Sequence, residues 1–176
     1  MDNLNSNYAI VRVQLSDYQK LSELSKKIYA QTYTYLWFDA GAWYMEEMYN
    51  PEKIVEELSD ENCEFFYFLL NNIPIGYLKL NLKSRIGSNG LDIERIYFDV
   101  NFAGKGLGSI LLNFGIEKAK KLGRENVFLK VMNCQTAAIK FYGKHGFTTR
   151  GNMFLDFETM KQEYRQLNTM VLSFEK

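Results

Sequence analysis

The chain carries a glycine-rich stretch, VNFAGKGLGS at residues 100–109, between an apolar strand-like run and an amphipathic helix-like run. Glycine lets the backbone turn in ways that other residues avoid, and it lets a ligand approach without meeting a Cβ. The first N–H groups of the helix that follows have no partner inside the helix and point outward. The stretch therefore predicts an anion site with phosphate as the natural ligand, although a tight turn used only for structure fits the glycines equally well.

Tyrosine and carboxylate side chains are the main candidates for acid and base chemistry. The sequence holds two cysteines, Cys63 and Cys134, without metal-ligand spacing, and a single histidine, His145. No metal site is therefore expected, and His145 is the one candidate for a histidine-based triad. Its place at a helix end favours an interaction with the terminal carbonyls, and Cys134 is expected to be a small buried packing residue.

The composition fits one domain over residues 1–176. Hydrophobic residues make up 47%, and 21 basic residues balance 21 acidic ones, so no global field favours nucleic acid or an anionic membrane surface. Residues 1–8 are polar and lack the order of a signal peptide, and no uncharged apolar run approaches the roughly 20 residues of a membrane helix. A cytoplasmic location is the default expectation.

Apolar periodicity predicts alternating strands and helices. Strands are expected at Tyr8–Leu15, Phe65–Leu70, Ile75–Leu82, Leu91–Val100, around 127–131, Phe147–Phe157 and Leu167–Phe174. Helices are expected from Ser16 to about Tyr33, over Ala42–Leu58 with a break at Asn50–Pro51, from the glycine stretch to near Gly123, and over Gln135–Lys144. The pattern predicts an α/β fold, with a central twisted mixed sheet of about seven strands and about four helices on its two faces.

Two motifs give the chain a family resemblance. The sequence IERIYF at 93–98 leads into AGKGLG at 103–108, and AIKFYGKHGF at 138–147 follows about thirty residues later. Together they resemble the GNAT superfamily of N-acetyltransferases over nearly the whole chain. More narrowly, NPEKIVEEL at 50–58, FFY at 65–67 and IERIY at 93–97 resemble the bacterial polyamine acetyltransferases of the PaiA type.

The resemblance implies an acetyl-CoA-dependent N-acetyltransferase. It implies that the glycine loop binds the pyrophosphate of acyl-CoA, and that the pantetheine arm lies between the strand at 96–100 and the strand near 127–132 like an added strand. The cofactor-binding residues it implies are Ile96, Tyr97, Phe98, Ala103, Gly104, Lys105, Gly106, Leu107, Gly108, Ser109, Asn133, Gln135 and Tyr142.

Two positions depart from the family's usual pattern. Ala103 stands where Arg or Gln is usual, so binding should rest on backbone N–H groups, with Lys105 able to add a charge. Gln135 stands where Asn is frequent. Both Gln135 and Asn133 can make that residue's hydrogen bond, and the sequence leaves the choice open.

Acetyl transfer to an amine needs a deprotonated amine, a stabilised oxyanion and a proton for the departing thiolate. Tyr142, with an ordinary pKa of about 10, stays protonated at pH 7 and can donate to a thiolate whose conjugate acid has a pKa of about 8.5. Glu94 is the candidate base through one or two waters, since deprotonating an alkylammonium at pH 7 costs roughly 4 to 5 kcal/mol. The N–H of Phe98, beside a strand bulge, is the candidate oxyanion donor. A core tyrosine and a surface carboxylate beside Arg95 are the alternative interpretations.

The acceptor side is unusually aromatic between residues 29 and 49, with acids among the rings. Aromatic rings and carboxylates can hold a cationic amine, although packing of helices on the sheet explains the same residues equally well. The candidates are Tyr33, Trp37, Trp43 and Glu46. A small-molecule amine such as a polyamine is favoured over a protein tail.

Other classes of function stay open beside an N-acetyltransferase. A non-catalytic acyl-CoA-binding regulator would use the same loop, and a protein or peptide N-acetyltransferase would differ only in the acceptor. A nucleotide-binding module is disfavoured because the loop lacks the Gly-Lys-Ser/Thr ending of a P-loop. Pairing of the two final strands between copies would give a homodimer.

Overall fold

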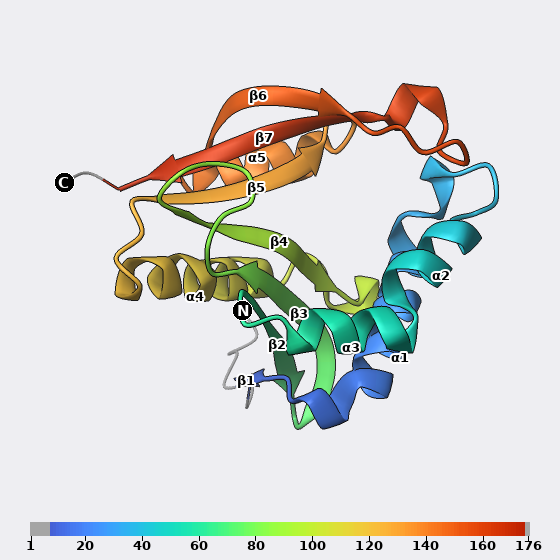
Figure 1. Ribbon diagram of the computed structural model, residues 1–176, viewed down its shortest axis with the longest axis horizontal. Coiled ribbons are helices and arrows are strands. Elements are labelled where there is room, and N and C mark those ends of the chain that lie inside the picture. The colour runs from blue at the N-terminus through green and yellow to red at the C-terminus, as the bar shows by residue number, and fades with distance from the viewer. Residues whose placement is uncertain (1–7, 175–176) are drawn as a thin grey trace.

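One mixed sheet of seven strands organises the protein in the computed structural model, which describes residues 8–174 (Figure 1). The strand order is β1-β2-β3-β4-β5-β7-β6, and only β4 and β5 pair in parallel. The strands are β1 (Tyr8–Arg12), β2 (Cys63–Leu70), β3 (Ile73–Asn81), β4 (Gly90–Phe98), β5 (Asn126–Met132), β6 (Thr148–Phe154) and β7 (Gln166–Ser173). The α/β class and the mixed seven-stranded sheet are confirmed, as is the antiparallel hairpin of β2 and β3.

The helices number five among the described residues, one more than expected. They are α1 (Tyr18–Thr32), α2 (Ala42–Tyr49), α3 (Pro51–Ser59), α4 (Leu107–Lys121) and α5 (Thr136–Lys144), with 3₁₀ turns at Leu15–Asp17, Thr34–Leu36, Val100–Phe102 and Gln162–Tyr164. The extra helix arises at Asn50–Pro51. Asn50 is extended and its Oδ1 accepts from the N–H of Lys53 at 2.7 Å, while Pro51 occupies the first turn of α3.

Period-two alternation along β2 gives the sheet two apolar faces. Phe65 and Tyr67 pack with residues of α1 and α3, whereas Phe66 and Phe68 pack with residues of α4. Because both faces are apolar, helices cover both, as the sequence predicted. Helix α5 packs beside α4 through Ala138, Ile139, Phe141 and Tyr142, which lie against the same core.

The two parallel strands, β4 and β5, stop pairing halfway along their length. Pairing of β4 with β5 runs from Gly90 opposite Asn126 to Ile93 opposite Leu129 and then stops. Beyond that point β4 stays paired with β3, and β5 stays paired with β7. In Figure 1 the two strands lie together at the left and separate toward the right, which leaves backbone groups on their facing edges without a strand partner.

A β-bulge lies where this separation begins. Arg95 is opposite Lys79 and Ile93 is opposite Leu80, so Glu94 is the extra residue of β4. Bulges turn a side chain out of the regular alternation and are frequent beside active sites. The bulge fixes where the carboxylate of Glu94 points.

Residues 1–7, most of the polar segment considered above, lie outside the described residues. Within residues 8–174, no helix combines the length and apolar character needed to cross a membrane.

Gly76 of β3 is a close-contact position opposite Phe98, at the end of β4. A Cβ there would meet the ring of Phe98 at 2.5 Å and the carbonyl oxygen of Tyr97 at 2.6 Å. We expect Gly76→Ala to lower the free energy of unfolding by about 1–3 kcal/mol, because backbone and ring must shift. Urea unfolding measures this. Gly151→Ala is the matched control, since nothing lies within 4 Å of its added Cβ; equal stability of the two variants would contradict the close contact.

Candidate active site

The glycine loop presents unpaired backbone donors at the start of α4. Gly104 and Gly106 have φ values of +75° and +77°, which favour glycine, and Gly106 is the N-cap of α4. Within residues 8–174, no hydrogen-bond partner is found for the N–H groups of residues 104–108. A Cβ added at Gly104 or Gly106 would meet nothing within 4 Å. The loop is thus open on one side and lined with donors, as an anion site requires.

A cavity of about 400 Å³ lies against this loop, and we call it the loop cavity. It is lined by Ile96, Phe98, Phe102, Ala103, Gly104, Gly106, Leu107, Gly108, Ser109, Phe141 and Tyr142. Phe102 and Phe141 were not among the sequence candidates. Lys105 does not line the cavity, and its Nζ lies 5.3 Å from the centre of the Phe102 ring.

The ladder of β3 and β4 aims backbone donors into the gap between β4 and β5. The N–H of Asp99 donates to the carbonyl of Ile75 at 2.8 Å. Because the residues of an antiparallel strand point their N–H groups alternately to either side, those of Phe98 and Ile96 turn away from β3 toward the gap. An extended ligand with a phosphate at one end fits this combination of gap and loop, which is the shape of coenzyme A.

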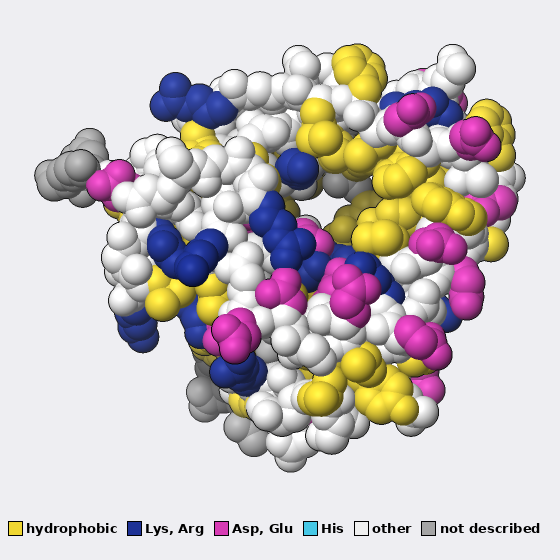
Figure 2. Space-filling model, in the orientation of Figure 1, with side chains coloured by type: hydrophobic (Ala, Val, Ile, Leu, Met, Phe, Trp, Pro, Cys, Tyr) yellow, Lys and Arg dark blue, Asp and Glu magenta, His cyan; other side chains and the backbone are white. Residues whose placement is uncertain are grey.

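A second cavity, of about 350 Å³, lies on the other side of the gap, and we call it the aromatic cavity. Its walls come from α1, α2, β4, β5, α5 and the segment between β6 and β7. They are formed by Tyr29, Tyr33, Leu36, Trp37, Tyr44, Met48, Ile93, Glu94, Ile96, Tyr97, Lys130, Val131, Met132, Gln135, Ala138, Tyr142, Leu155, Phe157, Met160 and Leu167. Figure 2 shows a hollow near the centre of this face of the molecule, with hydrophobic side chains gathered at its upper right.

Tyr142 of α5 lines both cavities. Burial, and then the neighbouring Tyr33, raise the pKa of Tyr142 above its ordinary value, so its hydroxyl stays protonated. The ring packs on Phe141 and Phe147 with centroids 5.3 and 5.9 Å away. No partner for the hydroxyl is found among the described residues. A protonated, unengaged hydroxyl at the junction of two cavities can act as a proton donor.

Glu94 faces the aromatic cavity from the bulge and is held by three side chains. Its carboxylate accepts from Lys79 Nζ at 2.6 Å and from Asn81 Nδ2 at 2.8 Å, and Arg95 Nη2 lies 3.6 Å away. Burial alone would raise the pKa of Glu94, but Lys79 and Arg95 outweigh it and the pKa lies below the ordinary value. Glu94 is therefore a fixed negative charge and a weak base.

Behind Glu94 lies a buried ion cluster made of Glu57, Lys79 and Arg95, which are only 8%, 3% and 4% exposed. Arg95 donates two hydrogen bonds to Glu57, at 2.8 and 2.9 Å, and Lys79 Nζ lies 2.7 Å from Glu57 Oε1. The cluster joins α3 to β3 and β4. Sequence reasoning missed Lys79, although a lone lysine inside the apolar run 73–82 is a signal for a buried, paired charge.

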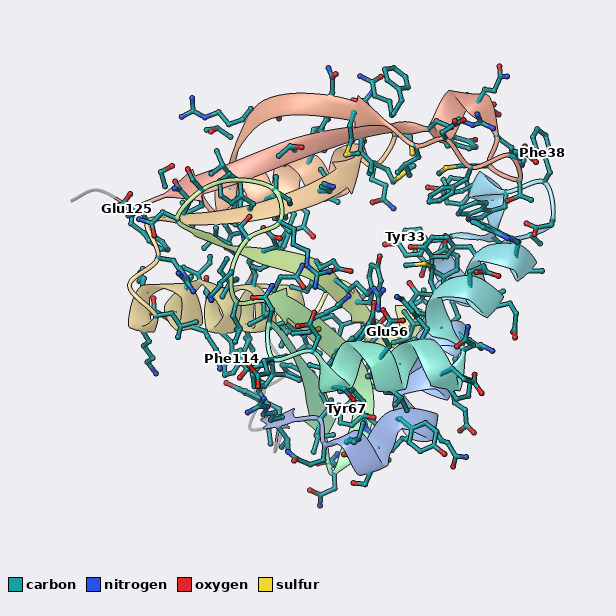
Figure 3. All side chains as sticks on the ribbon, viewed as in Figure 1. Tyr33, Phe38, Glu56, Tyr67, Phe114 and Glu125 are labelled. Carbon is teal, nitrogen blue, oxygen red and sulfur yellow. The ribbon has the colours of Figure 1, made fainter. Side chains whose placement is uncertain are left out.

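The acceptor candidates divide into two groups. Tyr33 and Trp37 line the aromatic cavity, whereas Trp43 and Glu46 do not. Helical spacing explains the difference, because Tyr44 and Met48, four residues apart on α2, occupy the face turned to the cavity. Trp43 instead lies behind Trp37 with ring centroids 6.1 Å apart, and Glu46 pairs with Lys26 at 3.2 Å. Figure 3 shows Tyr33 on the inner side of the helices and Phe38 on the outer side.

The candidate cofactor-binding residues also divide according to the cavity that they line. Tyr97 faces the aromatic cavity, against Tyr33 at 5.4 Å, and not the loop cavity. Gln135 lines the aromatic cavity too, whereas Asn133 lines neither cavity and shares hydrogen bonds with Gln166 and Asn168 of β7. Of the two residues that could replace the family's asparagine, Gln135 is the one placed near Tyr142.

Two sequence candidates remain at this end of the sheet, Cys134 and His145, and the structure agrees with the expectation for only one of them. Cys134 is exposed, so the expectation of a buried packing residue is wrong; it lies in the turn between β5 and α5, which the core does not cover. His145 ends α5 and its Nδ1 lies 2.9 Å from the carbonyl oxygen of Phe141. The expected interaction with the terminal carbonyls is confirmed.

Comparison with protein families gives one match over most of the chain. The model of the acetyltransferase (GNAT) family matches residues 24–147. An uncharacterized N-acetyltransferase in the pepI 3′ region of Lactobacillus delbrueckii subsp. lactis is 29% identical over 147 residues, which cover 79% of this chain and 83% of that protein.

Two further comparisons cover nearly the full length of the matched chain. The spermidine N(1)-acetyltransferase of Thermoplasma acidophilum is 24% identical over 161 residues, 88% of this chain and 96% of that one. The crystal structure of the PaiA N-acetyltransferase from Thermoplasma acidophilum in complex with coenzyme A superposes with a TM-score of 0.75 at 21% identity, covering 96% of this chain and 99% of that chain. These likenesses agree with the fold described above.

The lowered pKa of Glu94 gives a pH dependence of stability. Because the folded pKa lies below the ordinary 4.5, the ionised carboxylate stabilises the fold above pH 4.5, and this contribution disappears as the pH falls below 4.5 through the folded pKa. We expect Glu94→Gln to destabilise the protein at pH 7 and to lose less further stability than the unchanged protein on going to about pH 3.

Urea unfolding at a series of pH values tests this, with Glu117→Gln as the control because Glu117 is exposed and pairs with Lys120 of its own helix. Parallel stability curves for Glu94→Gln and the unchanged protein would show that Glu94 is not held as described.

Proposed function

This chain belongs to the GNAT acetyltransferase family, and we propose that residues 1–176 form one N-acetyltransferase domain that acetylates the primary amine of a small molecule by direct attack. Acetyl-CoA is the acyl donor of the family. The observation that carries the proposal is the position of Tyr142, whose side chain lines both the loop cavity and the aromatic cavity. A donor in one cavity and an acceptor in the other would meet at its hydroxyl.

The loop cavity is the proposed donor side. When bound, acetyl-CoA supplies an electrophilic thioester carbon. The N–H groups of residues 104–108 would hold its pyrophosphate, and the N–H of Ile96 would hydrogen-bond the pantetheine arm in the gap where β5 no longer pairs with β4. The N–H of Phe98 would donate to the acyl oxygen as negative charge develops there.

Tyr142 is the proposed general acid. Its raised pKa keeps the hydroxyl protonated, and a thiolate whose conjugate acid has a pKa of about 8.5 is a stronger base than water at neutral pH. The Tyr142 hydroxyl is a weaker acid than the thiol that forms, so its proton moves to the departing sulfur together with the breaking of the carbon–sulfur bond, and the tyrosine then regains a proton from solvent.

Glu94 is the proposed carboxylate for the incoming amine. It attracts the ammonium form to the bulge and accepts its proton through water, which passes the proton on to the solvent. Its low pKa makes it a weak base, so the supply of neutral amine should increase with pH over the range in which Tyr142 stays protonated.

The acceptor is proposed to be a small-molecule amine. The relative named spermidine N(1)-acetyltransferase and the PaiA structure support a PaiA-type enzyme as a model for this chain, and they make spermidine the first amine to test. An amine panel of spermidine, diamines, amino acids and a lysine peptide, assayed for release of free CoA, separates an enzyme from a binding regulator. Tight binding of acetyl-CoA without transfer to any amine would contradict the proposal.

Replacement of the proposed general acid gives the most direct test of the mechanism. Tyr142→Phe keeps the ring and removes the proton, so we expect kcat to fall by about 10²-fold while the affinity for acetyl-CoA changes little. Tyr67→Phe is the matched control, because the Tyr67 hydroxyl is also buried without a partner but lies in the core against α1 and α3. Unchanged kcat in Tyr142→Phe would remove the general-acid role.

The loop makes a second prediction, that binding rests on backbone amides. Lys105 points over Phe102, so we expect Lys105→Ala to weaken acetyl-CoA binding by no more than about threefold, the size of a surface charge effect. Gly106→Ala should weaken it by about tenfold or more, because a Cβ at φ +77° strains the loop.

Isothermal titration calorimetry with acetyl-CoA measures both affinities. Gly123→Ala is the control, since Gly123 has φ +65° and an open side at the far end of α4. A larger loss in Lys105→Ala than in Gly106→Ala would favour a side-chain clamp instead.

A further inference from the structure

The residues that line the aromatic cavity indicate which chemical groups the acceptor has besides its reacting nitrogen. Resting on the function proposed above, we propose that the acceptor is a primary amine with a single cationic nitrogen on an aromatic or other apolar body, and not a polyamine.

The cavity offers one carboxylate. Of the residues that line it in the described part of the chain, Glu94 is the only acid and Lys130 the only cation. Glu94 already faces Lys79 at 2.6 Å and Arg95 at 3.6 Å. A polyamine brings several ammonium groups, and each one moved out of water needs an anion or an equivalent set of acceptors. Beyond Glu94 this lining has no second carboxylate, and Lys130 would repel a second ammonium.

Two acids near the cavity, Asp39 and Glu57, are committed to other partners. Asp39 accepts from the N–H groups of Gly41 and Trp43 at 2.9 and 2.8 Å, which fixes the start of α2. Glu57 is enclosed with the Lys79 and Arg95 cations. Withdrawing either acid to meet an ammonium would disrupt a helix start or leave buried cations unpaired.

One wall of the aromatic cavity is a chain of rings in contact. From Phe157 it passes to Trp37 (5.9 Å between centroids), Tyr44 (5.0 Å), Tyr29 (4.8 Å), Tyr33 (5.1 Å) and Tyr97 (5.4 Å). The indole N–H of Trp37 donates to the Tyr29 hydroxyl at 2.8 Å. That donor is therefore satisfied within the wall, and the faces and edges of the rings form much of the surface that the wall presents to a ligand.

The segment between β6 and β7 completes the apolar enclosure. Leu155, Phe157 and Met160 line the cavity from this segment. It is fixed to the chain after α1, since the N–H of Phe38 donates to Thr159 at 2.9 Å and the N–H of Lys161 donates to Leu36 at 3.0 Å. An apolar ligand body is thus met by ordered apolar surface from both sides, and aromatic bodies gain most from stacked or edge contacts with such rings.

Amine selectivity tests the inference. We expect kcat/KM for 2-phenylethylamine to exceed that for spermidine by about tenfold or more, because burial of its aromatic ring stabilises the bound state. An equal or higher kcat/KM for spermidine would overturn the inference and leave the proposed acetyl transfer standing. If no amine is acetylated, the proposed function fails, and binding then decides the inference by itself.

Binding is measured by calorimetry on the protein saturated with CoA, with 2-phenylethylamine and spermidine as titrants. Tighter binding of 2-phenylethylamine supports the inference, and tighter or equal binding of spermidine contradicts it. Phe157→Ala should weaken 2-phenylethylamine binding by about fivefold or more through lost ring contact. Phe154→Ala is its control, because that ring is 70% exposed and lies outside the cavity; equal losses in the two variants would contradict the proposed wall.

Discussion

The backbones of β4 and β5 stop pairing after Ile93 and Leu129, and both cavities depend on that separation. On the β4 side, the ladder with β3 continues and turns the N–H groups of Ile96 and Phe98 into the gap. Below the gap, the glycine loop adds unpaired donors at the start of α4, and beside it α5 brings Tyr142 to the boundary of the two cavities. A sheet paired along its full length would leave no room for an extended ligand.

Separated strands need support from elsewhere, and two kinds of contact provide it. On the β4 side the buried cluster of Glu57, Lys79 and Arg95 ties α3 to the sheet and holds Glu94 at the bulge. A buried ion cluster is weak evidence for stability but strongly fixes orientation, because removing one partner leaves a buried charge unpaired. On the β5 side, aromatic rings from α1 and α2 meet the segment between β6 and β7. Charge thus sets the reacting end of the aromatic cavity, and apolar rings set its other end.

Local patterns predicted much of this architecture and little of the acceptor side. The alternation of 63–70, the glycines at 104–108 and the Pro51 break each act within a few residues, so strands, loop and helix start could be expected. The contributions of Phe157, Met160 and Lys79 depend on contacts between segments far apart in the chain, which periodicity does not encode. Trp43 and Glu46 were selected for residue type, and only the helical phase of α2 shows that Tyr44 and Met48 face the cavity instead.

The central claim is that donor and acceptor meet where β4 and β5 separate, beside Tyr142. A crystal structure of this chain with bound coenzyme A tests it most directly. The account predicts that the pyrophosphate contacts the N–H groups of residues 104–108, that the pantetheine arm lies in the gap, and that its sulfur is within about 3–4 Å of the Tyr142 hydroxyl. Coenzyme A bound outside the gap, or with its sulfur far from that hydroxyl, would contradict the account.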